Sequence, residues 1–93
     1  MKTLPGDARA YRRSPTFDET TVPPGLLRHH TTAPGTWARI VVLEGRLRYR
    51  ILAPVLEEVE LTPGSPGIVE PEVPHEVVPA GPVTFYVEFC RVA

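Results

Sequence analysis

Apolar and polar residues alternate with a period of two along several short segments of the chain. In segment 46–52, RLRYRIL, an arginine stands at every second position and apolar residues stand between. Segment 85–90, FYVEFC, alternates in a similar way, and segment 37–44, WARIVVLE, contains a continuous apolar run. These patterns are typical of strands that turn one face toward a core. Glu44 and Gly45 are predicted to reverse the chain between segments 37–44 and 46–52, which would form a hairpin.

The remaining apolar segments are short and lie between clusters of proline and glycine. The pattern predicts further strands at Leu26–Thr32, Glu58–Leu61, Ile68–Glu70, His75–Val78 and Val83–Val92. Segment 1–25 carries only isolated apolar side chains, and we expect an extended arm or edge strand that packs on the rest. Seven or eight short strands predict one all-β domain over residues 1–93, a sandwich or a small barrel.

Composition strengthens the all-β prediction and indicates the cellular compartment. The 12 prolines and 7 glycines leave almost no room for an ordinary helix. No apolar run approaches the length of a membrane span, and the first residues lack the apolar region of a secretory signal. The single cysteine fits a reducing compartment, so we expect a cytoplasmic protein. The absence of Asn and Gln favours a thermophilic source, with codon bias as the alternative.

Charge is divided unevenly between the two halves of the chain. Residues 1–50 hold nine basic and four acidic side chains, whereas residues 51–93 hold one basic and seven acidic side chains. The basic residues are not interleaved with aromatic ones in the way that binds nucleic acid, so we expect no nucleic-acid partner. We interpret the arginines of segment 46–50 as the solvated face of a strand that pairs with the glutamates of segment 57–60.

Three histidines are the first candidates for chemistry. His29 and His30 are adjacent, so on a strand only one of them would face the interior, and the pattern does not choose between them. His75 follows the carboxylate-rich segment 69–74, VEPEVP, and imidazole together with carboxylate suits Zn, Fe, Ni, Cu or Mn. Glu88 interrupts an apolar strand. Its side chain is expected either on the solvent face of that strand or buried in a functional role. We interpret Cys90 as a packing residue.

Two segments resemble known motifs. Segment 37–49, WARIVVLEGRLRY, resembles the strand–turn–strand motif of cupins, and segment 67–75, GIVEPEVPH, resembles their second motif, which leads through proline to a metal-binding histidine. More specifically, about residues 3–91 resemble the small TehB/YeaR-like cupin family, which is related to the N-terminal domain of some tellurite-resistance proteins. Further matching segments are Leu4-Pro5, 11–17, 22–32 and 85–89.

The resemblance implies a cupin double-stranded β-helix, a conical jelly-roll barrel whose mouth can hold a divalent metal. It selects His30 over His29. The implied metal ligands are His30, His75, Glu72 and Glu88, and the expected pocket-lining residues are Trp37 and Tyr86. Ala38 stands where general cupins have a glutamate ligand, and no His-x-His precedes it, so any metal must use a different set of ligands.

These observations favour a non-enzymatic protein that binds a divalent metal (Zn, Fe or Ni) or a small anion inside the barrel. A role in tellurite or other oxyanion stress follows from the resemblance alone. The alternatives are a small metalloenzyme acting on a stress metabolite, with Glu72 or Glu88 as general base, and an interaction domain whose barrel mouth contacts a partner. We expect a homodimer paired through sheet edges.

Overall fold

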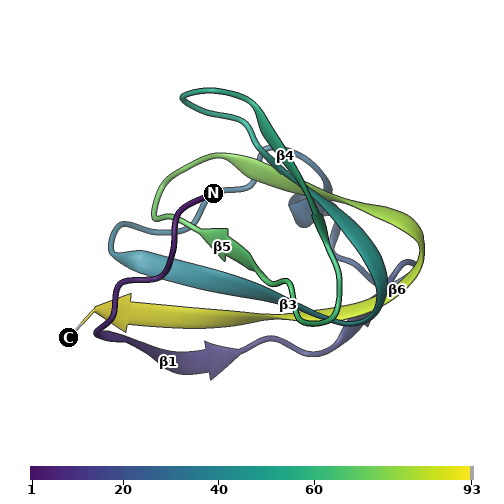
Figure 1. Cartoon of the computed structure of the whole chain (residues 1–93), viewed down its shortest axis with the longest axis horizontal. Coiled ribbons are helices and arrows are strands. Elements are labelled where there is room, and N and C mark those ends of the chain that lie inside the picture. The colour runs from purple at the N-terminus through teal and green to yellow at the C-terminus, as the bar shows by residue number, and fades with distance from the viewer. Residues whose placement is uncertain (93) are drawn as a thin grey trace.

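The computed structural model describes residues 1–92 and shows an all-β domain built on two long strands (Figure 1). Strand β3 spans Thr36–Ile51 and strand β6 spans His75–Val92. They pair antiparallel over nearly their whole length, from Thr36 opposite Arg91 to Ile51 opposite His75. The shorter elements are β1 (Ala8–Arg13), β2 (Phe17–Asp18), β4 (Glu57–Leu61), β5 (Gly67–Val69) and one 3₁₀ helix, η1 (Pro24–Leu27).

All strands belong to one antiparallel sheet in the order β1-β6-β3-β4, with β2 also paired to β6 and β5 also paired to β3. Within residues 1–92 no pairing joins β1 to β4, so the sheet stays open. The closed barrel expected from the resemblance is corrected to an open sheet whose two long strands curve around the interior (Figure 1). The cupin jelly roll itself stays a prediction.

The hairpin predicted at Glu44 and Gly45 is wrong. Gly45 lies inside β3 with φ of 82°, and the pairing with β6 shifts register on both sides of it. Such irregularities bend a strand without ending it, and a positive φ suits glycine because it has no Cβ. The two predicted strands are therefore two halves of β3, and β6 lies beside both of them.

The strand predicted at Leu26–Thr32 is also wrong. Pro24 begins η1, because the fixed φ of proline suits the first helical position. His29 then has φ of 39°, which interrupts an extended chain. Only His30 forms a bridge, an isolated antiparallel one with His75. The segment therefore brings one histidine, instead of a whole strand, to the start of β6.

The core lies on the concave face of the sheet. The inward positions of β3 and β6 alternate as the sequence predicts, and Phe85, Leu47 and Leu61 are fully buried. The other core members are Val22, Ala38, Ile40, Val42, Tyr49, Ile51, Val69, Val77, Val83 and Val87. Phe17 of β2 packs on Phe85 with ring centroids 5.7 Å apart. The N-terminal part of the chain therefore helps to cover the core.

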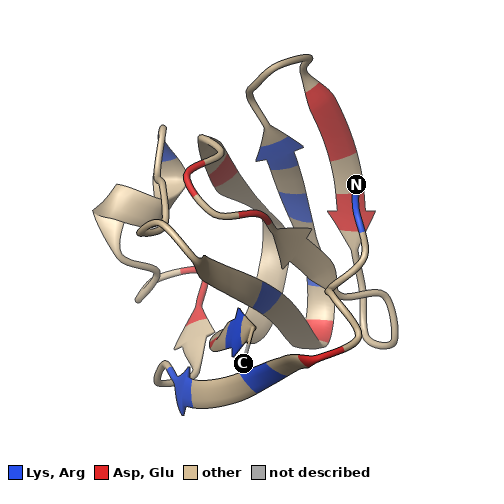
Figure 2. Ribbon diagram, turned by 90° about the vertical axis from the view of Figure 1, so that its left-hand side faces the viewer, with Lys and Arg blue, Asp and Glu red and all other residues tan. Residues whose placement is uncertain are grey.

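The predicted ladder between arginines and glutamates is confirmed. Arg46 pairs with Glu60 at 3.4 Å, and Arg50 pairs with Glu58 at 3.1 Å. Arg50 also reaches Glu76 of β6 at 2.8 Å, so it connects β4 to β6 across β3. Figure 2 shows the basic and acidic bands side by side on β3 and β4. These groups are partly exposed, so each pair contributes little to stability and mainly fixes the register.

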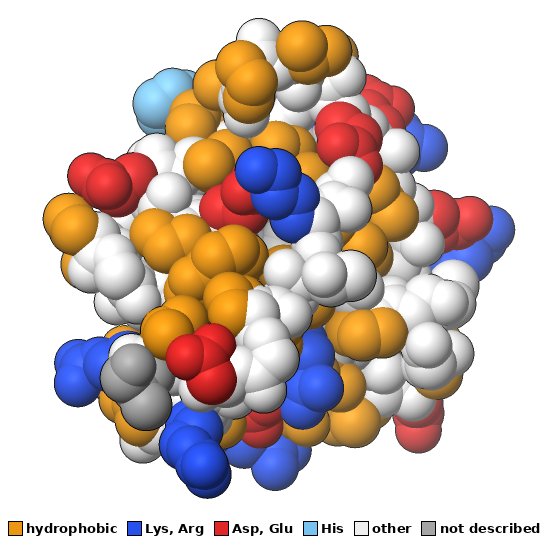
Figure 3. Space-filling model, turned by 60° about the vertical axis from the view of Figure 1, so that its left-hand side comes forward, with side chains coloured by type: hydrophobic (Ala, Val, Ile, Leu, Met, Phe, Trp, Pro, Cys, Tyr) orange, Lys and Arg blue, Asp and Glu red, His pale blue; other side chains and the backbone are white. Residues whose placement is uncertain are grey.

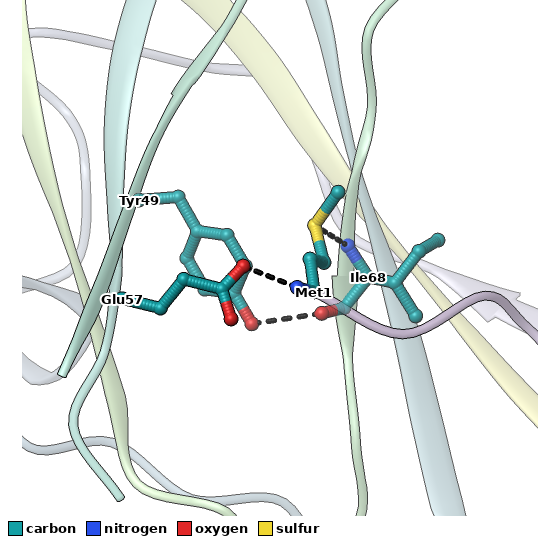
Figure 4. A network of polar contacts seen from close by, with 4 residues as sticks. All are labelled: Met1, Tyr49, Glu57 and Ile68. Atoms are coloured by element: carbon teal, nitrogen blue, oxygen red, sulfur yellow. Dashed lines mark hydrogen bonds and ion pairs between the residues drawn. The ribbon is translucent and has the colours of Figure 1, made fainter. Parts of the chain in front are cut away.

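The start of the chain is held between β4 and β5 (Figure 4). The amine of Met1 pairs with the carboxylate of Glu57, and the Met1 sulfur accepts a hydrogen bond from the Ile68 amide at 3.1 Å. The hydroxyl of buried Tyr49 donates to the Ile68 carbonyl at 2.9 Å. Burial raises the pKa of Tyr49 well above its ordinary value, so this hydroxyl stays protonated as a donor.

Apolar side chains also reach the surface. Val55, Leu56 and Leu43 are exposed by 74%, 54% and 46%. Figure 3 shows one face on which hydrophobic side chains gather among charged ones. In the part of the chain described, no helix has the length and apolar character needed to cross a membrane.

Candidate functional site

A cavity of about 320 Å³ lies between segment 12–32 and the concave face of the sheet. Its inner wall is formed by side chains of β3, β5 and β6, and its other side is bordered by residues 12–15, β2, η1 and the segment that follows η1. The wall is mostly apolar, with aromatic and aliphatic groups from both sides. Representative members are Phe17, Leu26, Ile40, Val77, Phe85 and Phe89.

Two histidines meet in this wall. The backbones of His30 and His75 exchange both hydrogen bonds, at 2.7 and 2.9 Å, and this bridge fixes their side chains next to each other. The Nδ1 atom of His30 lies 3.3 Å from the Nε2 atom of His75, and the rings are nearly perpendicular. The structure thus places His30, and not the exposed His29, beside His75.

A backbone carbonyl sets the tautomer of His75. Its Nδ1 atom lies 3.1 Å from the carbonyl oxygen of Val73, which can only accept a hydrogen bond. Neutral His75 therefore carries its proton on Nδ1 and a lone pair on Nε2. That lone pair either accepts a hydrogen bond from Nδ1–H of His30 or points, together with a lone pair on Nδ1 of His30, at a shared electrophile such as a metal ion. In the described residues, Nε2 of His30 has no hydrogen-bond partner.

Burial keeps both imidazoles neutral near pH 7. Loss of solvent lowers the pKa of His30. The same cause lowers the pKa of His75, opposed by its hydrogen bond to Val73 and helped by the nearby charge of His30. Neutral imidazole is the form that ligates metals and accepts hydrogen bonds.

This burial predicts a pH dependence of stability. Because the histidine pKa values are lower in the folded than in the unfolded chain, the unfolded chain binds more protons below the ordinary histidine pKa of about 6.5. We therefore expect the free energy of unfolding, measured with urea in the presence of EDTA, to fall as the pH decreases from 7.5 to 5.5. The slope should become smaller in His75→Gln. An equally steep slope in that variant would show that His75 does not cause the pH dependence.

The other polar groups of the cavity are already paired or exposed. The Ser14 hydroxyl donates to the Pro15 carbonyl and accepts from the Val87 amide, and the Thr32 hydroxyl donates to the Thr36 carbonyl at 2.9 Å. Arg12 and Arg13 line the cavity from exposed positions at the end of β1. The histidine pair is thus the polar feature inside an otherwise apolar chamber.

The predicted carboxylates lie apart from this pair. Glu88 alternates with the inward residues of β6 and bonds to Arg39 at 2.8 Å on the opposite face. Glu72 is exposed, with φ of 65°, in the loop before β6. Among residues 1–92 no three histidine, cysteine or acidic side chains are grouped to hold a metal ion. The roles of Glu72 and Glu88 as ligands stay predictions, which the variants below test.

The two aromatic residues expected in the pocket also lie elsewhere. Neither Trp37 nor Tyr86 is among the described residues that line the cavity. Their neighbours Ala38 and Phe85 face inward, so alternation turns both aromatic rings to the other face of the sheet. There Tyr86 lines a shallower groove and lies under the guanidinium of Arg13, 3.6 Å from its ring centroid.

Sequence reasoning missed several residues that shape the site. Phe17 lies in the N-terminal segment, whose isolated apolar side chains give no periodic signal, and the pattern places Leu26 in a strand, whereas it lies in η1. In the sequence, each is an apolar residue two positions after a proline. The Val73 carbonyl orients His75 through a backbone atom, which no side-chain pattern reveals.

The two histidines fit a divalent metal as a partial set of ligands. Zinc–imidazole bonds of about 2.0–2.1 Å at tetrahedral angles place two ligand nitrogens about 3.3–3.4 Å apart. The observed separation of 3.3 Å between Nδ1 of His30 and Nε2 of His75 agrees with that value. The proton on Nδ1 of His75 is held by a carbonyl, as is usual for a ligating histidine. The remaining positions on a metal would be left for water or a ligand.

The comparisons with known proteins agree with this fold. The model of the TehB-like domain family matches residues 12–87. A structural-genomics crystal structure of a protein from Escherichia coli K12 superposes with a TM-score of 0.90 at 20% identity, covering 100% of this chain and 99% of the other. TehB from Haemophilus influenzae superposes with a TM-score of 0.84 at 25% identity over 94% of this chain.

The chain corresponds to only 32% of the length of the Haemophilus influenzae protein. A comparison with curated proteins found no match. The family model covers more than four fifths of the sequence, from the end of β1 into the second half of β6. Through this match, the chain belongs to the TehB-like domain family, which is linked to tellurite-resistance proteins.

Proposed function

We propose that this domain is a binding protein that holds a divalent metal between His30 and His75 and presents it to a small ligand in the cavity. The observation that carries the proposal is the 3.3 Å separation of Nδ1 of His30 and Nε2 of His75 in the cavity wall. A metal with two protein ligands keeps open positions, as sites that bind exogenous ligands do.

The surroundings of the pair support this role. The backbone bridge fixes both residues, and the Val73 carbonyl orients the ring of His75. Burial holds both rings in the neutral form that ligation requires. When bound, the metal would act as a Lewis acid toward a donor atom of the ligand. The link to tellurite and other oxyanions rests on the family, and binding without catalysis is the proposed activity.

Zinc titration of EDTA-treated protein without an affinity tag tests the metal site. We expect one zinc per chain in the wild type and in His29→Ala, because His29 is exposed and lies outside the pair. His30→Ala should raise the dissociation constant by about a hundredfold or more, since loss of a ligand exceeds the 10–100-fold typical of supporting residues. Glu72→Gln and Glu88→Gln test the two predicted carboxylates in the same assay.

Two outcomes of this titration would contradict the proposal. Zinc binding that is equally weak in the wild type and in His30→Ala would show that the pair holds no metal. Equal losses in His29→Ala and His30→Ala would place the metal on the exposed segment. A loss in Glu72→Gln or Glu88→Gln would instead add that carboxylate to the site.

Other expectations stay predictions. A homodimer paired through sheet edges would sediment as a species of about twice the chain mass of 10.3 kDa, and a 10.3 kDa species would contradict it. A cytoplasmic location and a thermophilic source are inferred from the sequence alone.

A further inference from the structure

We infer that the natural occupant of the cavity is a small organic molecule with an apolar body and one acidic or hydrogen-bonding head group, and not an inorganic oxyanion. This inference deepens and rests on the proposed function, because the head group is the part that would meet the histidine pair and its metal. The apolar body would fill the chamber between η1 and the sheet.

The distribution of polar atoms carries the inference. Apart from the histidines, the hydroxyls of Ser14 and Thr32 already donate to backbone carbonyls. The two arginines of the lining are exposed: Arg13 stacks on Tyr86, and the guanidinium of Arg12 lies over Phe89, 5.9 Å from its ring centroid. Nε2 of His30 has no hydrogen-bond partner within residues 1–92. Apart from these two exposed arginines, the cavity therefore offers one polar contact point and otherwise apolar walls, which is the usual arrangement for an organic ligand.

The size of the cavity agrees with such a ligand. An apolar cavity of about 150 Å³ accommodates benzene, and ligand sites in proteins begin at about 300 Å³. At about 320 Å³, this chamber has room for one substituted ring or a short branched chain. Phe17, Phe85 and Phe89 supply aromatic surfaces against which a ring can pack.

An oxyanion fits the same chamber poorly. It would give up its hydration shell, and the walls formed by Ile40, Val77 and Val87 offer no hydrogen bond in return. Even with a metal at the histidines, most of the cavity would lie beyond the reach of a small inorganic ion. The apolar walls would then remain without a packing partner.

Ala38 gives a way to test the chamber separately from the metal. It is 1% exposed and lines the cavity, so a larger side chain there would occupy ligand space without removing a histidine. Val41, three positions further along β3, lines the groove on the other face of the strand and provides a control.

The experiment uses calorimetric titration of the zinc-loaded full chain with 4-ethylphenol, and with ethylbenzene as the matched molecule that lacks the head group. We expect 4-ethylphenol to bind about tenfold more tightly, which corresponds to one good polar contact. Ala38→Leu should weaken the binding of both molecules at least tenfold, and Val41→Leu should leave it unchanged. Should Ala38→Leu fail to melt cooperatively, Leu26→Trp blocks the chamber from η1 instead.

Zinc binding is measured on the same samples, so the two proposals can fail separately. If the wild type binds 4-ethylphenol in the presence of EDTA and Ala38→Leu does not, the organic occupant is supported even if zinc does not bind. Zinc binding without any binding of 4-ethylphenol, or with equal binding in Ala38→Leu, overturns the inference and leaves the metal site in place. Displacement of 4-ethylphenol by tellurite or inorganic phosphate also overturns it.

Discussion

Gly45→Ala is expected to lower the free energy of unfolding by about 4 kcal/mol or more, an unusually large effect for the addition of one methyl group. Gly45 has φ of 82°, which costs any other residue about 1–2 kcal/mol. In addition, a Cβ at this position would overlap the backbone oxygen of Pro82, which cannot move aside like a flexible side chain. Urea denaturation measures the loss directly.

Gly64→Ala is the matched control for this substitution. Gly64 has φ of 89°, but a Cβ there would meet nothing within 4 Å. Its substitution should therefore cost only the conformational part, about 1–2 kcal/mol. If the two variants lose the same free energy of unfolding, β3 and β6 do not approach each other at Gly45 as described. The description of β3 as one continuous bent strand would then be wrong.

His75→Ala is expected to weaken metal binding at least as strongly as His30→Ala. It removes the Nε2 ligand and also the ring that lies 3.3 Å from His30. We expect the dissociation constant to rise by about a hundredfold or more, as in His30→Ala, because each variant leaves a single imidazole. Zinc titration followed by elemental analysis measures the effect.

A second variant separates loss of the ligand from loss of the fold. His75 is 3% exposed, so truncation to alanine also leaves a cavity in the core. His75→Gln keeps most of the volume and a hydrogen-bonding group, and it should melt cooperatively while binding zinc no better than His75→Ala. Retained zinc affinity in a folded His75→Gln would contradict the role of this ring.

The sequence predicts much of the fold where periodicity and charge act together. The alternation in segment 46–52 identifies both the inward face of Leu47 and Tyr49 and the arginines that pair with β4. The prediction from the sequence fails at Gly45, because a glycine between two apolar runs is compatible both with a hairpin turn and with a bent strand. Which one forms depends on β6, whose Val83 pairs with Gly45 from a distant part of the chain.

The candidate site was predictable in its histidines and not in its surroundings. Alternation alone left the choice between His29 and His30 open, because apolar residues stand on both faces of the predicted strand; in the structure both histidines lie beyond η1 in irregular chain. The family resemblance chose His30, which meets His75. Glu88 could not be placed from its own strand, since its partner Arg39 lies on β3. The apolar cavity depends on Phe17, whose segment carries no periodic signal, and on Leu26, which is predicted in a strand but lies in η1.

The most direct test of a metal held by His30 and His75 is a crystal structure of the zinc-loaded protein with anomalous data collected at the zinc edge. We expect one anomalous peak about 2.0–2.1 Å from both Nδ1 of His30 and Nε2 of His75, with Nδ1 of His75 still donating to the Val73 carbonyl. No peak at this position in zinc-soaked crystals, with the two rings in direct hydrogen-bond contact, would contradict the proposed metal site.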